Sequence, residues 1–165
     1  MSNKIIILTG EIQIGKTTLL QQVCVQQKNM AGILTPVVNG KRMFYNIETG
    51  DFFAMEANEE EEKLSVGKYL FSATAFAKAN DILLSANQNT TITHLIIDEI
   101  GPLELKQQKG LYNSFNSILH SSFKHTLIIV VRRALVETVI SAFNLTNAAV
   151  MDIAKMKAYF SVTGN

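Results

Sequence analysis

Hydrophobic residues gather in short uninterrupted runs that alternate along the chain with longer segments of mixed polarity. The runs predict strands buried on both faces, and the longer segments repeat apolar residues at helical spacing. This alternation favours an α/β fold with a mostly parallel sheet covered by helices on both faces. The predicted strands are residues 4–8, 31–38, 41–47, 52–55, 93–97, 126–131 and 148–153. The predicted helices are residues 17–27, 69–88, 106–122 and 135–143, and a tail or a helix follows residue 153.

Residues 31–56 depart from this alternation, because several strand patterns follow one another without a helix between them. Pro36 favours an edge position or a bend. Asn39-Gly40 is a two-residue turn signal typical of a β-hairpin. We therefore predict a β-meander here, inserted as a hairpin into a single domain that spans residues 1–165.

A glycine-containing segment lies between the first predicted strand and the first predicted helix. It reads GEIQIGKT, the G-x-x-x-x-G-K-[ST] spacing of a phosphate-binding loop. Its glycines allow tight wrapping around an anion, and its N–H groups and the helix N-terminus favour negative charge. We expect Lys16 to reach the β- and γ-phosphates and Thr17 to ligate Mg²⁺. The predicted nucleotide-binding residues are Gly10, Glu11, Ile12, Gln13, Ile14, Gly15, Lys16, Thr17 and Thr18.

Another predicted strand ends in two acidic residues, Asp98 and Glu99. Ligands of open α/β sheets bind at the carboxyl ends of the strands, so these acids are expected near the loop. Asp98 is expected to hold Mg²⁺ through water beside Thr17. Glu99 is expected to polarise a water for attack on the γ-phosphoryl group. Capping of the following turn is the structural alternative for both acids.

A third predicted strand ends in Arg132 and Arg133. Either side chain could stabilise charge that develops on the phosphates, and strand alternation allows at most one of them to do so. We assign this catalytic role to Arg132, beside Lys16 and Glu99, and a surface ion pair is the alternative. Lys41 and Arg42 are weaker candidates.

Composition narrows the class of protein. Of 165 residues, 47% are hydrophobic and 18% charged, which indicates a globular chain, and the net charge of +1 argues against nucleic-acid binding. The acidic run at residues 58–63 predicts a solvated loop or a helix start. The single cysteine, Cys24, is expected in the core of a helix, and one cysteine without a membrane span fits the cytoplasm. His94, His120 and His125 lack metal-ligand spacing.

Three segments together resemble the THEP1-type nucleoside triphosphatases, P-loop proteins of the NTPase_1 family. The segments are GEIQIGKTTL, AGILTPVVNGKRMFYNI and HLIIDEIGPLEL, and the later strand ending in Arg-Arg adds to the resemblance. The resemblance implies a RecA-like core and Mg²⁺-dependent hydrolysis of ATP, GTP and other nucleoside triphosphates with loose base preference. It also matches Glu104 to a family acid with no settled role.

The chain departs from the family pattern at two places. Pro36-Val37-Val38 stands where acidic and basic residues are usual, and Val131 stands where a histidine is frequent. Two other classes stay open beside hydrolysis. One is a nucleotide or small-molecule kinase, which would need an acceptor other than water. The other is a non-catalytic nucleotide-binding switch that contacts an unidentified protein partner through residues 31–56.

Overall fold

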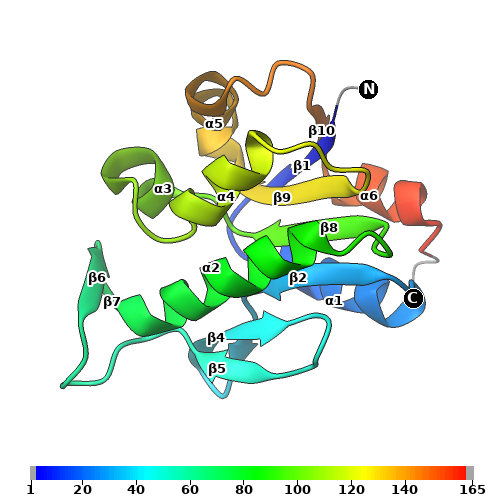
Figure 1. Cartoon of the computed structure of the whole chain (residues 1–165). Helices are drawn as coiled ribbons and strands as arrows, with labels where there is room; N and C mark the ends of the chain where they lie inside the picture. The colour runs from blue at the N-terminus through cyan, green and yellow to red at the C-terminus, as the bar shows by residue number, and fades with distance from the viewer. Residues whose placement is uncertain (1–2, 163–165) are drawn as a thin grey trace.

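The computed structural model describes residues 3–162, which build a main sheet with helices on both faces and a small second sheet (Figure 1). Within these residues the main sheet has eight strands in the order β10-β1-β9-β8-β2-β4-β3, with β5 paired to β4. The strands from β10 to β2 pair in parallel, which confirms the predicted α/β class. Their bounds are Ala149–Met151 for β10, Lys4–Gly10 for β1, Thr126–Arg132 for β9, His94–Asp98 for β8 and Met30–Leu34 for β2.

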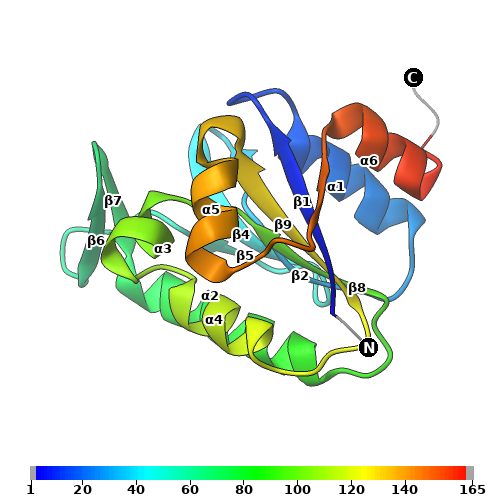
Figure 2. The ribbon, with the colours of Figure 1, turned by 90° about the horizontal axis from the view of Figure 1, so that it is seen from above.

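Successive residues of the central strands fill two cores on opposite faces of the sheet, because strand side chains alternate in direction. On β1, Ile7 belongs to one core, whereas Ile6 and Leu8 belong to the other. Helices α2 to α5 cover the first core, and α1 and α6 cover the second (Figure 2). No helix within residues 3–162 is long and apolar enough to cross a membrane. The bounds are Lys16–Gln26 (α1), Ala73–Gln88 (α2), Pro102–Gln107 (α3), Tyr112–Leu119 (α4), Val136–Phe143 (α5) and Ile153–Phe160 (α6).

The first strand of the predicted meander, β2, has two kinds of neighbour. Fully buried β2 pairs in parallel with β8 on one side and antiparallel with β4 on the other, so it joins the parallel sheet to the predicted antiparallel strands. The predicted strand at residues 31–38 is interrupted at Thr35 and Pro36, and the strands that follow extend the sheet in antiparallel pairs. These are β3 (Val37–Val38), β4 (Lys41–Asn46) and β5 (Phe52–Ala54).

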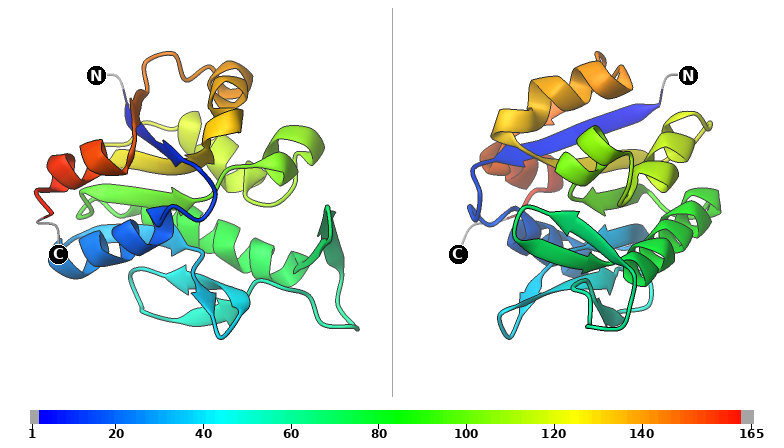
Figure 3. Two further views of the ribbon diagram at one scale, coloured as in Figure 1. Left: turned by 180° about the vertical axis from the view of Figure 1, so that it is seen from behind. Right: turned by 90° about the vertical axis from the view of Figure 1, so that its left-hand side faces the viewer.

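The helix predicted at residues 69–88 begins four residues later than expected. Lys63–Val66 (β6) and Tyr69–Ser72 (β7) pair as an antiparallel hairpin that stands apart from the main sheet (Figure 3). Gly67 makes the turn at φ 56°, and the Ser72 hydroxyl caps α2 by accepting a hydrogen bond from Ala75 N at 3.0 Å. The acidic run before β6 is a loop, so its alternative as a helix start is wrong.

The helix predicted at residues 106–122 is two helices, α3 and α4. Gln108 and Gly110 adopt left-handed φ values of 50° and 66°, which end the first helix and turn the chain. Glu104 holds the turn, because its carboxylate accepts hydrogen bonds from Gly101 N at 2.9 Å and from Leu111 N at 2.8 Å. Hydrophobic periodicity does not predict hydrogen bonds of this kind, from backbone N–H groups to a side chain.

Candidate functional site

The carboxyl ends of β1, β9 and β8 meet around one cavity of about 450 Å³, which we call the loop cavity. Strand β9 lies between β1 and β8, so the acidic pair is two strands away from the loop. The structure nevertheless brings Asp98, Glu99 and Arg132 to the same cavity as residues 12–18. Gly10 and Glu11 belong to the start of the loop and do not line the cavity.

In the loop between β1 and α1, backbone carbonyl groups contact the side chain of the loop's own lysine. Lys16 Nζ donates hydrogen bonds to Gly10 O at 3.1 Å and to Glu11 O at 2.7 Å. Burial lowers the pKa of Lys16, and the carboxylates of Glu99 and Asp98 oppose that shift. Gly15 precedes α1 at φ 97°, a conformation that favours glycine, and the first N–H groups of the helix are free to bind an anion.

Asp98 is 2% exposed and lies beneath the loop. One of its oxygens, Oδ2, accepts hydrogen bonds from Thr17 Oγ1 at 2.7 Å and from Thr35 N at 3.0 Å. Burial raises the pKa of Asp98, and both hydrogen bonds oppose the shift. A buried carboxylate beside a hydroxyl is an oxygen donor set that suits Mg²⁺. No group of three or more His, Cys, Asp or Glu side chains among residues 3–162 could hold a metal, so phosphate oxygens and water would supply the other ligands.

Glu99 and Arg132 form an ion pair at the wall of the loop cavity. Arg132 Nε lies 2.6 Å from Glu99 Oε1, and the two side chains are 39% and 22% exposed, respectively. Arg133 instead lies 3.4 Å from Glu11 in an exposed pair outside the cavity lining. The structure therefore brings Arg132 and not Arg133 to the cavity. Strand alternation does not apply to the pair, because β9 ends at Arg132 and Arg133 starts a short 3-10 helix.

Three further residues line the loop cavity, although sequence patterns pointed to them weakly or not at all. Thr35 follows the carboxyl end of β2, the same kind of position that singled out Asp98, so this signal was available. Arg42 was only a weak candidate, and it lines the cavity from β4. Tyr69 reaches the cavity from the β6–β7 hairpin, and the incorrect helix prediction concealed it.

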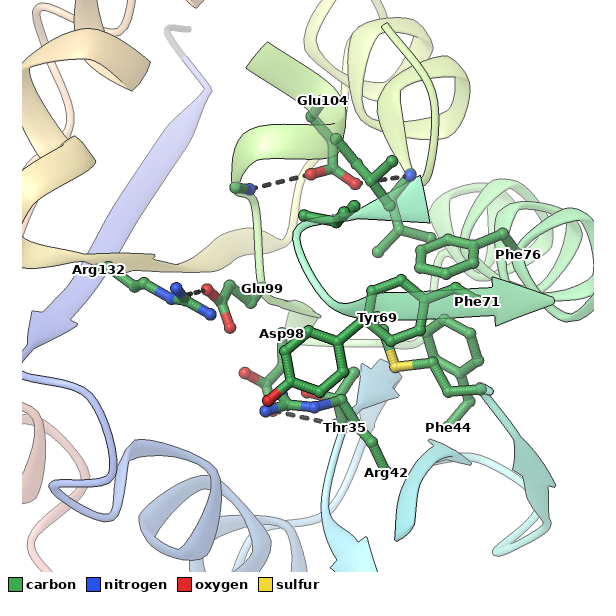
Figure 4. A pocket seen from close by; sticks show the side chains of 15 residues that line it. Thr35, Arg42, Phe44, Tyr69, Phe71, Phe76, Asp98, Glu99, Glu104 and Arg132 are labelled. Carbon is green, nitrogen blue, oxygen red and sulfur yellow. Dashed lines mark hydrogen bonds and ion pairs between the residues drawn. The ribbon is translucent and has the colours of Figure 1, made fainter. Parts of the chain in front are cut away.

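A smaller pocket of about 90 Å³ adjoins the loop cavity and shares Asp98, Glu99 and Arg132 with it (Figure 4). We call it the apolar pocket, because hydrophobic side chains form most of its wall. Figure 4 shows Phe44, Phe71 and Phe76 on one side and the carboxylates of Asp98 and Glu99 on the other. The apolar lining residues are Phe44, Met55, Val66, Tyr69, Phe71, Phe76, Leu103 and Leu111.

Glu104 also borders the apolar pocket, but both of its oxygens accept backbone hydrogen bonds. Burial raises the pKa of Glu104 from its ordinary value of 4.5 to about 7, against the effect of those hydrogen bonds. Its geometry gives it a structural task, holding the turn between α3 and α4. The acid that the resemblance left without a role is thus a support for the segment that follows Glu99.

We expect Glu104→Gln to flatten the pH dependence of stability. The folded protein keeps a proton on Glu104 that the unfolded chain loses, so the free energy of unfolding falls as pH rises from about 4.5 to about 7. This contribution is on the order of 3 kcal/mol. Urea unfolding at pH 5, 6, 7 and 8 measures it, with exposed Glu137→Gln as control. An unchanged slope in Glu104→Gln would contradict the assignment.

The remaining candidates lie outside the loop cavity. Cys24 is partly buried against the second core, and burial raises its pKa to about 12, so it is a core residue as predicted. His94 starts β8 and its Nε2 lies 3.1 Å from the Tyr159 hydroxyl. His120 is exposed on α4's C-terminal end, and buried His125 stacks on a neighbouring phenylalanine ring.

Comparisons with known proteins concern the sequence and the fold of the chain. Residues 5–157 match the NTPase_1 family of NTPases. The nucleoside-triphosphatase THEP1 of Saccharolobus solfataricus is 31% identical over 112 residues, which cover 61% of this chain and 62% of that protein. The match therefore spans less than two thirds of that relative's length.

Two solved structures have the same fold. The crystal structure of THEP1 from the hyperthermophile Aquifex aeolicus has a TM-score of 0.70 at 25% identity, over 90% of this chain and 89% of the other. The solution structure of a human cancer-related nucleoside triphosphatase has a TM-score of 0.67 at 21% identity, over 93% and 90%. The second similarity concerns the fold alone.

Proposed function

The chain belongs to the NTPase_1 family, and on this premise we propose that it hydrolyses ATP, GTP and related nucleoside triphosphates with Mg²⁺ and loose base preference. One observation carries the proposal. A single cavity joins the phosphate-binding loop to a buried carboxylate, Asp98, and to a partly exposed one, Glu99. The first suits a metal and the second suits a water, so the site has the groups that hydrolysis needs.

Residues 10–18 would bind the triphosphate through backbone N–H groups and the N-terminus of α1. Lys16 would exchange its two carbonyl partners for the β- and γ-phosphates. The phosphate charge would compensate for the burial that now lowers the pKa of Lys16, so a bound nucleotide keeps this ammonium group charged.

Thr17 and Asp98 would hold Mg²⁺, the threonine through its hydroxyl and the aspartate directly or through water. Their hydrogen bond of 2.7 Å already holds both oxygens side by side. When bound, Mg²⁺ neutralises charge on the phosphate oxygens. The N–H of Thr35 restrains the carboxylate of Asp98 and so fixes its orientation toward the loop.

Glu99 would orient the attacking water and accept its proton. Arg132 donates to Oε1 of this carboxylate, which leaves Oε2 for the water. The same arginine would also offer its terminal N–H groups to the γ-phosphate, where negative charge develops. The ion pair therefore fixes the base and provides a cation in one contact.

Phosphate release from ATP, GTP, CTP and UTP, each with MgCl₂ and with EDTA, tests the proposed function. Lys16→Ala is expected to lower the rate by at least about 10²-fold, because it removes a cation that contacts the transferred group. Lys28→Ala, an exposed change beyond the end of α1, should keep the wild-type rate. Release from none of the four nucleotides, or equal rates in wild type and Lys16→Ala, would contradict hydrolysis at this site.

A further inference from the structure

The apolar pocket has no task in hydrolysis, although it opens beside the residue proposed to orient the attacking water. Glu99 borders both the apolar pocket and the loop cavity, and so does Arg132. A water molecule needs polar partners, and an apolar wall offers it none. The pocket therefore fits a molecule that has an apolar body and reaches Glu99 with one polar group.

The walls come from four separate parts of the fold. Phe44 belongs to β4, Phe71 to β7, Phe76 to α2 and Leu103 to α3, and all four are buried. Ring contacts tie the wall together, since the Phe76 ring centroid lies 5.0 Å from that of Phe44 and 5.8 Å from that of Phe71. Such a wall is rigid enough to select a ligand by shape.

The volume limits what can enter. A space of about 90 Å³ corresponds to roughly three water molecules, or about four to five packed carbon atoms. Charge limits it further. The lining pairs two carboxylates, Asp98 and Glu99, with two arginines, Arg42 and Arg132, so it has no excess charge that would select a charged ligand. Both oxygens of Glu104 are already hydrogen-bonded. A neutral hydroxyl group fits, because it can donate its proton to Glu99.

We propose that the apolar pocket binds the alkyl part of a short aliphatic alcohol and that its hydroxyl takes the place of the attacking water. This inference rests on the proposed function, because Glu99 and the loop serve both reactions. The alcohol oxygen forms a bond to the γ-phosphorus, and the bond from that phosphorus to the β,γ-bridging oxygen breaks. Glu99 accepts the hydroxyl proton. The products are an alkyl phosphate and a nucleoside diphosphate, and water is the acceptor when the pocket is empty.

Phosphorus-31 NMR of the products tests this reaction. Wild-type protein with MgATP receives 3-methylbutan-1-ol, 2-methylpropan-1-ol or, as a polar control, glycerol at equal concentration. Each branched alcohol is expected to form its phosphate monoester at least about tenfold faster than glycerol, since the apolar wall binds the methyl groups. Monoester from neither branched alcohol, beside normal phosphate release, overturns this inference and leaves hydrolysis standing.

A substitution in the pocket wall tests whether the alcohol binds in the apolar pocket. Val66 on β6 lines the apolar pocket but not the loop cavity. Val66→Phe fills the space and should lower monoester formation by about tenfold or more while phosphate release from water stays unchanged. Val66→Ala enlarges the pocket and should keep monoester formation. It is the second test of the pocket if the larger side chain of Val66→Phe disturbs the hairpin. Monoester formation at the wild-type rate in Val66→Phe overturns the site. Monoester without any phosphate release in water supports the inference and contradicts hydrolysis.

Discussion

Glu99→Gln is expected to lower the rate of phosphate release by about 10²–10⁴-fold, the usual contribution of a general base. The amide keeps the shape of the side chain but cannot take the proton of the attacking water. Its oxygen can still accept from Arg132, whose Nε lies 2.6 Å from Oε1, so the cavity wall should keep its form. Steady-state phosphate release with MgATP measures the loss.

Nucleotide affinity distinguishes loss of the general base from disruption of the nucleotide-binding site. A fluorescent ATP analogue should bind Glu99→Gln with a dissociation constant within about threefold of wild type, because the proposed phosphate contacts come from the loop and from Lys16. Glu137→Gln is the control. Glu137 is an exposed glutamate on α5 that does not line the loop cavity. Full activity of Glu99→Gln would remove this residue as the base.

Local sequence patterns predicted the parts of the site that are built from residues adjacent in the chain. The loop from Gly10 to Thr17 is one contiguous motif, and Asp98 stands directly after a run of buried apolar residues. Strand ends meet at one edge of a parallel sheet, so their convergence followed without knowledge of strand order. The order itself did not follow, because the placement of β9 between β1 and β8 depends on packing across the whole sheet.

The remaining part of the site depends on strand pairing and side-chain hydrogen bonds that hydrophobic periodicity does not reveal. Tyr69 and Leu70 fit a helical pattern with the residues after them, but pairing of β7 with β6 prevails. The pairing brings Tyr69 to the loop cavity and Phe71 to the apolar pocket. Likewise, the hydrogen bond from Leu111 N to Glu104 ends a helix that periodicity alone would continue.

Gly32 lies on β2, next to the backbone of β8. It stands opposite Ile96 in the parallel ladder, at φ 118°. A Cβ atom there would lie 2.7 Å from Ile96 N and would overlap the carbonyl of the same residue. Three residues further on, Thr35 N donates to Asp98, so this glycine sets the spacing on which that hydrogen bond depends.

Gly32→Ala is therefore expected to lower the free energy of unfolding by at least about 4 kcal/mol, or to prevent folding, because backbone overlap and a left-handed φ combine. Urea unfolding monitored by circular dichroism measures the change. Gly40→Ala is the matched control, since Gly40 also has a positive φ, 76°, but open space around it. That variant should lose only about 1–2 kcal/mol from backbone strain. Equal losses in the two variants would show that φ alone matters and that β2 can move away from β8, which would remove the close approach as a support of Asp98.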